Sequence, residues 1–113
     1  MKMLAGLIVA AAGVVAVSAV QAQDTVIRPQ QTIQFKPGAY GCLSRDKLDA
    51  VNDHARAGEQ QKMQEFFSGF ECLSTPENQQ FRVVQVVGHE VEFVNAGNTD
   101  QQGLWTNDGF IKQ

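Results

Sequence analysis

The stretch FRVVQVVGHEVEFV, residues 81–94, decides the fold. Its first half, residues 81–87, is rich in valine, and residues 90–94 alternate glutamate with valine or phenylalanine. β-Branched residues and a two-residue alternation both favour strands. Gly88 and His89 lie between the halves, and a two-residue loop with glycine first is a common hairpin turn. The stretch therefore predicts an antiparallel β-hairpin.

Two helices are expected before the hairpin. The first runs over residues 44–58, because Ser44 can cap its start and Gly58 can end it. The second is expected over about residues 59–68. Its apolar positions recur at i, i+3, i+4 and i+7: Met63, Phe66, Phe67 and Phe70. We assign the three phenylalanines to the core.

The first 22 residues are expected to be a cleaved secretory signal peptide. Lys2 precedes an uncharged apolar run over residues 4–19, and Val20 and Ala22 stand at positions −3 and −1 of the expected cut. A spanning helix needs about 20 apolar residues, and no stop-transfer cluster follows Ala22. We therefore expect a periplasmic or secreted protein with no stable membrane anchor after cleavage.

The mature chain divides into two parts on this reading. Residues 23–38 are polar and contain two prolines, which predicts a flexible leader with a short strand near residues 32–35. Residues 39–113 form the folded domain. Cys42 and Cys72 are the only cysteines, and an even count in an oxidising compartment predicts one disulfide. Catalytic thiol pairs usually stand two residues apart, so this wide spacing favours a structural bond that brackets the helical pair.

The C-terminal part carries a family resemblance. After the hairpin come a glycine-containing loop, residues 95–102, and GLWTNDGFI, residues 103–111. This succession resembles the end of bacterial SH3-like domains, which typically close with glycine and tryptophan, a tight turn and a final apolar residue. The whole arrangement is similar to small exported proteobacterial proteins. The resemblance implies an α+β fold: a disulfide-bracketed helical pair followed by a small antiparallel SH3-like sheet or barrel.

Two surfaces are candidates for binding. Tyr40 and Trp105 are the only residues of their types, and aromatic side chains line peptide grooves in SH3-like domains. We expect them to line a ligand groove together with the 95–102 loop, although Trp105 could instead be a core residue. The second candidate is a partner face at i, i+3 and i+7 of the first helix, which could meet a basic partner or simply face water: Asp46, Asp49 and Asp53.

Charge and motif content exclude several functions. The chain has nine basic and 12 acidic residues, and without Lys2 its net charge is −4. Nucleic-acid binding needs a basic surface, so no such partner is expected. His54 and His89 lack a second ligand at metal spacing, and no nucleophile stands with a base. We expect no catalytic residue, no metal and no cofactor.

These observations predict a non-catalytic periplasmic or secreted interaction module that binds a protein or a cell-wall peptide. The alternative is an exported inhibitor, immunity or exclusion protein that blocks an incoming enzyme or transfer machine. Both fit a small acidic domain with one disulfide.

Overall fold

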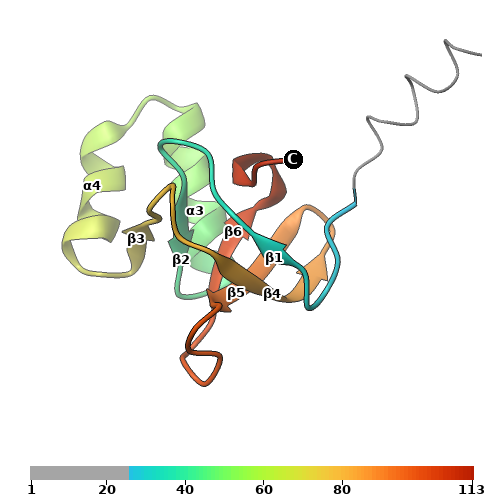
Figure 1. The fold of residues 1–113 in the computed structure, drawn as a ribbon. Helices are drawn as coiled ribbons and strands as arrows, with labels where there is room; N and C mark the ends of the chain where they lie inside the picture. Colours follow the sequence, from blue (N-terminus) through green and yellow to red (C-terminus); the bar gives the residue numbers. More distant parts are fainter. Residues whose placement is uncertain (1–25) are drawn as a thin grey trace, which may run out of the picture.

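The computed structural model describes residues 26–113, which form a six-stranded sheet and two α-helices (Figure 1). Along the chain the elements are β1 (Thr32–Ile33), β2 (Tyr40–Cys42), α3 (Arg45–Arg56), α4 (Gln60–Ser68), β3 (Cys72–Ser74), β4 (Phe81–Val87), β5 (Glu90–Asn95), β6 (Leu104–Asn107) and a 3-10 helix (Asp108–Phe110). The strands are ordered β1-β4-β5-β6-β2-β3 and all neighbours are antiparallel. The α+β class is confirmed. The expected signal peptide, residues 1–22, lies outside the described residues.

The predicted hairpin is confirmed as β4–β5. Only Gly88 and His89 separate the two strands, and Gly88 has φ 61°, a left-handed conformation that glycine adopts without steric cost. Val91 and Phe93 are buried, as the alternation predicts. A register shift in β4 leaves Val84 exposed, which is the usual consequence of a β-bulge.

The sheet curls around a core of aromatic rings. Phe35, Phe81 and Phe93 meet edge to face, with ring centroids 4.8 to 5.2 Å apart. Phe35 also forms a β-bridge with Ile111, which directly follows the 3-10 helix. The segment after β1 is therefore tied to the C-terminal segment as well as packed on the sheet, and the core between them is enclosed.

The segment expected to be a flexible leader, residues 23–38, is packed on this core in its described part. Ile27, Ile33 and Phe35 are buried, and β1 pairs with β4. The domain therefore begins well before residue 39, which corrects the predicted boundary. The polar composition concealed this because the partners of these apolar residues lie far along the chain, in β4 and at Ile111.

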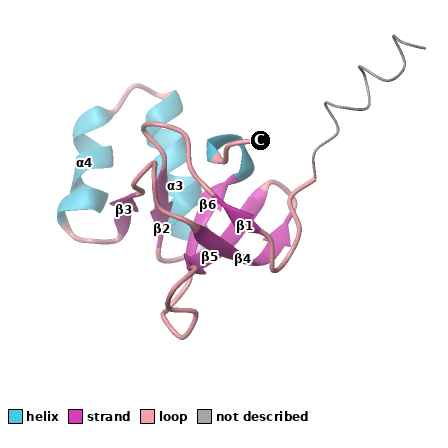
Figure 2. Ribbon diagram, in the orientation of Figure 1, coloured by secondary structure: helices cyan, strands magenta, loops and turns pink. Residues whose placement is uncertain are grey.

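Helix α3 begins and ends where the sequence predicts. Ser44 is the N-cap, and its Oγ accepts a hydrogen bond from the backbone N–H of Lys47 at 3.2 Å. Gly58 follows the last turn with φ 74°. Leu48 and Val51 are fully buried and give the helix its inward face. Helix α3 packs against β2 and β6, and α4 packs against α3 and β3 (Figure 2).

Helix α4 is less buried than expected. It has no fully buried residue, and Met63, Phe66 and Phe67 are only half-buried against α3 and β3. Phe70 is 72% exposed, so its assignment to the core is wrong. The helix ends at Ser68, and Phe70 adopts φ 59° as the chain turns toward β3. The apolar spacing therefore continues past the last helical residue.

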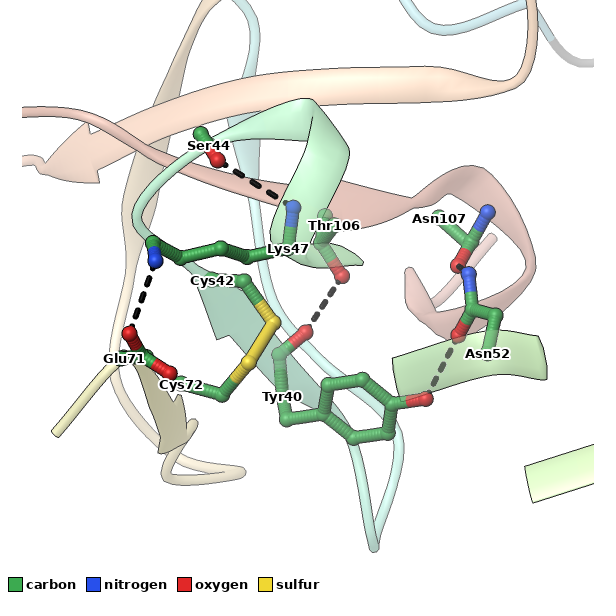
Figure 3. The surroundings of a disulfide bond; sticks show 9 residues. All are labelled: Tyr40, Cys42, Ser44, Lys47, Asn52, Glu71, Cys72, Thr106 and Asn107. Carbon is green, nitrogen blue, oxygen red and sulfur yellow. Dashed lines mark hydrogen bonds and ion pairs between the residues drawn. A yellow bond between two sulfur atoms is a disulfide. The ribbon is translucent and has the colours of Figure 1, made fainter. Parts of the chain in front are cut away.

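The predicted disulfide is confirmed and joins β2 to β3. Cys42 and Cys72 stand directly opposite each other in the strand register, and both are fully buried beneath the helices. Beside the bond, Lys47 Nζ lies 2.8 Å from Glu71 Oε2 (Figure 3). The covalent link thus connects the strand before α3 to the strand after α4.

Candidate binding cleft

A cleft of about 250 Å³ opens between the β2–β3 pair and the loop from β5 to β6. It is lined by six apolar residues and three carboxamides: Leu43, Leu73, Phe81, Phe93, Val94, Leu104, Asn95, Gln101 and Gln102. Leu43 is 36% exposed and Leu73 is 39% exposed, so these two form the lip. Phe81 and Phe93 are buried members of the aromatic core and form the base.

The Phe93 ring can lie at the base of the cleft because residue 41 of β2 is glycine and has no side chain. A Cβ at this position would lie 2.7 Å from the ring of Phe93, closer than real Cβ contacts allow. The phenyl ring therefore takes the space that any larger residue in β2 would occupy. Leu104 Cβ lies 3.2 Å from the same point, so the strand, the ring and Leu104 are packed in direct contact.

The loop that forms the other wall, residues 95–102, is held by its own hydrogen bonds. Asn95 Oδ1 accepts from the N–H of Gly97 at 2.8 Å, and the N–H of Asn98 donates to the Asn95 carbonyl at 3.1 Å. The N–H of Asn95 donates to Oε1 of Gln101 at 3.2 Å. The loop projects from the sheet (Figure 1), and these contacts bring its far end back to the cleft.

The lining of the cleft offers no acid, base or nucleophile. None of its nine residues carries an ionisable side chain or a hydroxyl. Its chemistry is limited to apolar contact from one wall and amide hydrogen bonding from the other. Such a combination of apolar surface with a few orienting polar groups is typical of binding sites.

A family model for Sap1-like surface attachment proteins matches residues 5–113. The chain belongs to this family. The match includes both cysteines, the helical pair and all six strands. No curated protein and no solved structure matches the chain, so the SH3-like resemblance stays a prediction. The family description names attachment to a surface, which indicates a surface or secreted protein.

The two lip leucines were not identified from the sequence, although a signal for them exists. Successive residues of a strand point to opposite faces. Once Cys42 and Cys72 are joined and buried on one face, the residues that follow them, Leu43 and Leu73, must point to the other. The disulfide would therefore have implied that these leucines share a face, had strands been predicted at both cysteines.

The structure corrects the expectation that Tyr40 lines a groove. Tyr40 is 8% exposed and packs against Phe67 and Phe110, with ring centroids 5.5 and 4.8 Å away. Its hydroxyl donates to Asn52 Oδ1 at 2.6 Å, and Asn52 Nδ2 donates to Asn107 at the same distance (Figure 3). Burial raises the pKa of the Tyr40 phenol. Tyr40 shares the helix-covered face with Cys42, opposite the cleft.

Trp105 also lies on the helix-covered face, because it stands opposite Cys42 in the register of β2 and β6. It is half-buried against the helix-side cluster, and the Arg45 guanidinium lies 5.6 Å from its ring centroid. Trp105 and Tyr40 are therefore both separated from the 95–102 loop by the sheet. The ends of the loop, Asn95, Gln101 and Gln102, line the cleft, but the residues across from them are Leu43 and Leu73 rather than the two aromatic residues.

The acidic residues of α3 are exposed, and two of the three have partners within the protein. The side-chain hydrogen bond with Glu90 raises the pKa of Asp49, and the same contact lowers the pKa of Glu90. Asp53 forms an ion pair with Arg56. The face of Asp46, Asp49 and Asp53 as a partner surface stays a prediction.

The histidines form local pairs. His54 Nδ1 lies 2.8 Å from Glu59, and His89 Nδ1 lies 2.9 Å from Asp108, whose hydrogen bond and charge raise the pKa of His89. Within residues 26–113, no group of three or more His, Cys, Asp or Glu side chains is placed to hold a metal ion. In the same range, no helix is long and apolar enough to cross a membrane.

Proposed function

We propose that this protein is exported by cleavage after Ala22 and acts as a non-catalytic interaction module in the periplasm or outside the cell. It contributes to surface attachment by binding a protein or a cell-wall peptide in the cleft behind Leu43 and Leu73. The observation that carries the proposal is the cleft, an uncharged and largely apolar hollow with two exposed leucines at its lip.

Three further observations support this function. The family description names surface attachment. The buried disulfide suits an oxidising compartment outside the cytoplasm. Exposed apolar side chains gathered at a hollow often mark interaction sites on soluble proteins. A ligand in the cleft would cover Leu43 and Leu73 without disturbing the helices, which pack on the opposite face of the sheet.

The test of this function is attachment by cells. A strain without the gene is complemented with the native protein, with Leu73→Asp or with Val87→Asp, and attached cells are counted on glass and on polystyrene. Val87 is the matched control, because it is 36% exposed and lies in β4, outside the cleft lining. We expect Leu73→Asp to abolish the gain in attachment and Val87→Asp to preserve it. Equal attachment by all three, with equal thermal stability, would refute the cleft as the site.

Export is tested separately by intact-mass measurement of the envelope fraction. The expected mass is that of a chain beginning at Gln23 with one disulfide. A mass that retains residues 1–22 would instead mean that the apolar segment stays on the protein as an anchor.

A further inference from the structure

We infer that the cleft's ligand is an uncharged protein segment: one of its aliphatic side chains enters between the lip leucines, and the adjacent backbone carbonyl accepts a hydrogen bond from Gln101. This inference rests on the proposed function and narrows its partner to protein rather than cell-wall peptide.

The orientation of the Gln101 carboxamide supports a carbonyl ligand. Oε1 of Gln101 accepts the backbone N–H of Asn95. Only the carboxamide oxygen can fill that role, because the amide nitrogen has no acceptor lone pair in this chemistry. The contact therefore fixes which end of the side chain turns toward Asn95. The Nε2 amide nitrogen belongs to a residue that is exposed and lines the cleft, and it is the end of this side chain that can donate to a ligand.

The absence of charge in the lining supports an uncharged ligand. A buried charge without a counter-charge loses its hydration at a large cost, and none of the nine lining residues can compensate it. Cell-wall stem peptides end in a carboxylate, and many membrane lipids carry an anionic headgroup. Neither finds a cationic partner in the lining, and the expected mature chain is itself acidic.

The volume is large enough for a single side chain. The cleft measures about 250 Å³, whereas pockets for drug-sized ligands hold roughly 300–1,000 Å³. An engineered apolar cavity of about 150 Å³ binds benzene. One leucine, isoleucine or phenylalanine side chain with its neighbouring peptide unit therefore matches the space, and the lip leucines supply apolar contact on the open side.

The test is an NMR titration of the exported chain with two neutral probes, acetyl-Ala-Leu-Ala-amide and acetyl-Ala-Asn-Ala-amide. We expect the leucine peptide to shift the signals of Leu43, Leu73, Leu104 and Gln101, and the asparagine peptide to shift them far less. Equal responses to the two probes, or no response to the leucine peptide at millimolar concentration, would overturn the inference.

The hydrogen bond is tested by Gln101→Glu. Glutamate keeps the oxygen that accepts from Asn95 but removes the donor, so we expect affinity for the leucine peptide to fall at least about fivefold. Gln61→Glu, on the exposed side of α4, makes the same charge change as a control and should leave affinity unchanged. Unchanged affinity in Gln101→Glu would refute the assigned carbonyl contact.

Two further probes distinguish this inference from the proposed function. The chain is incubated with phosphatidylcholine vesicles and with purified peptidoglycan, each with and without Leu73→Asp. The chain could bind the vesicles or the peptidoglycan, lose that binding in Leu73→Asp, and show no binding of the leucine peptide. That result would refute the protein ligand and leave the cleft as the attachment site. If Leu73→Asp also leaves cell attachment unchanged, the proposed function fails as well.

Discussion

Replacing Tyr40 separates a packing role from a binding role. Its ring is buried between Phe67 and Phe110, and its hydroxyl donates to Asn52 at 2.6 Å. Tyr40→Phe keeps the ring but leaves the Asn52 oxygen without this donor, which should lower the free energy of unfolding by about 1–2 kcal/mol. Tyr40→Ala also removes the ring, and large aromatic-to-alanine changes in cores cost about 3–5 kcal/mol.

The measurement is urea denaturation with the disulfide intact, followed by Trp105 fluorescence and far-ultraviolet circular dichroism. Domains of this kind are typically stable by only about 5–15 kcal/mol, so Tyr40→Ala should lose much of its folding free energy. A Tyr40→Ala variant within about 1 kcal/mol of the native protein would refute the packing argument. Weakened ligand binding in that stable variant would restore the aromatic groove.

Tyr40 should also make the stability of the protein depend on pH above about pH 10. Burial raises the pKa of Tyr40 above its ordinary value of 10.0, so the folded state holds this proton more tightly than the unfolded state. The resulting stabilisation is fully present below pH 10 and is lost as the pH rises through the folded-state pKa. Tyr40→Phe should therefore show a smaller loss of stability above pH 10 than the native protein.

Three other outcomes are expected. Gly41→Ala should lower the free energy of unfolding by about 1–3 kcal/mol in urea titrations, because the added Cβ would press on the Phe93 ring. Gly103→Ala should lower it less, because the nearest atoms to its added Cβ belong to the flexible Glu92 side chain. Reduction of the disulfide should lower the same quantity by about 3–4 kcal/mol, and equal denaturation midpoints for the oxidised and reduced protein would contradict this. NMR titration should give His89 a pKa above 6.5 that falls toward 6.5 in Asp108→Asn, and its stabilisation should be present below pH 6.5 and lost as the pH rises through the folded-state pKa.

Local signals in the sequence predicted much of the fold. The hairpin turn at Gly88, the Ser44 cap and the end of α3 at Gly58 all depend on residues within a few positions of one another. The disulfide followed from the number of cysteines and the expected compartment. None of these features required knowledge of which distant segments meet.

The features that depend on distant pairing were missed or misplaced. Ile33 pairs with Phe81, and Phe35 with Ile111, so the role of the first described residues is set by the far end of the chain. Phe70 follows a helical spacing that the chain abandons two residues earlier. Composition and periodicity do not predict the strand pairing of the first described residues or the end of α4, because tertiary contacts decide both.

The residues expected to line a groove are divided between the two faces of the sheet, for a reason that lies in the strand alternation. The loop over residues 95–102 was expected to form one wall, and its two ends line the cleft. The expected partners, Tyr40 and Trp105, are aromatic and conspicuous, but they lie on the face that carries Cys42. A shift of one residue along a strand changes the face, and the lip leucines stand one residue after each cysteine.

The division of the β2–β3 pair into two faces explains how a small domain can keep leucines exposed. Full burial of one leucine side chain would contribute about 1.5–3 kcal/mol, and Leu43 and Leu73 each forgo part of this. On the opposite face, the disulfide contributes about 3–4 kcal/mol, and Leu48 and Val51 of α3 pack fully buried against the same strands. The strands that present the leucines are therefore stabilised from behind. Because none of that stabilising structure covers the cleft, the domain can hold an open apolar surface in a fixed shape, which is the physical requirement for a binding site that works without a catalytic group.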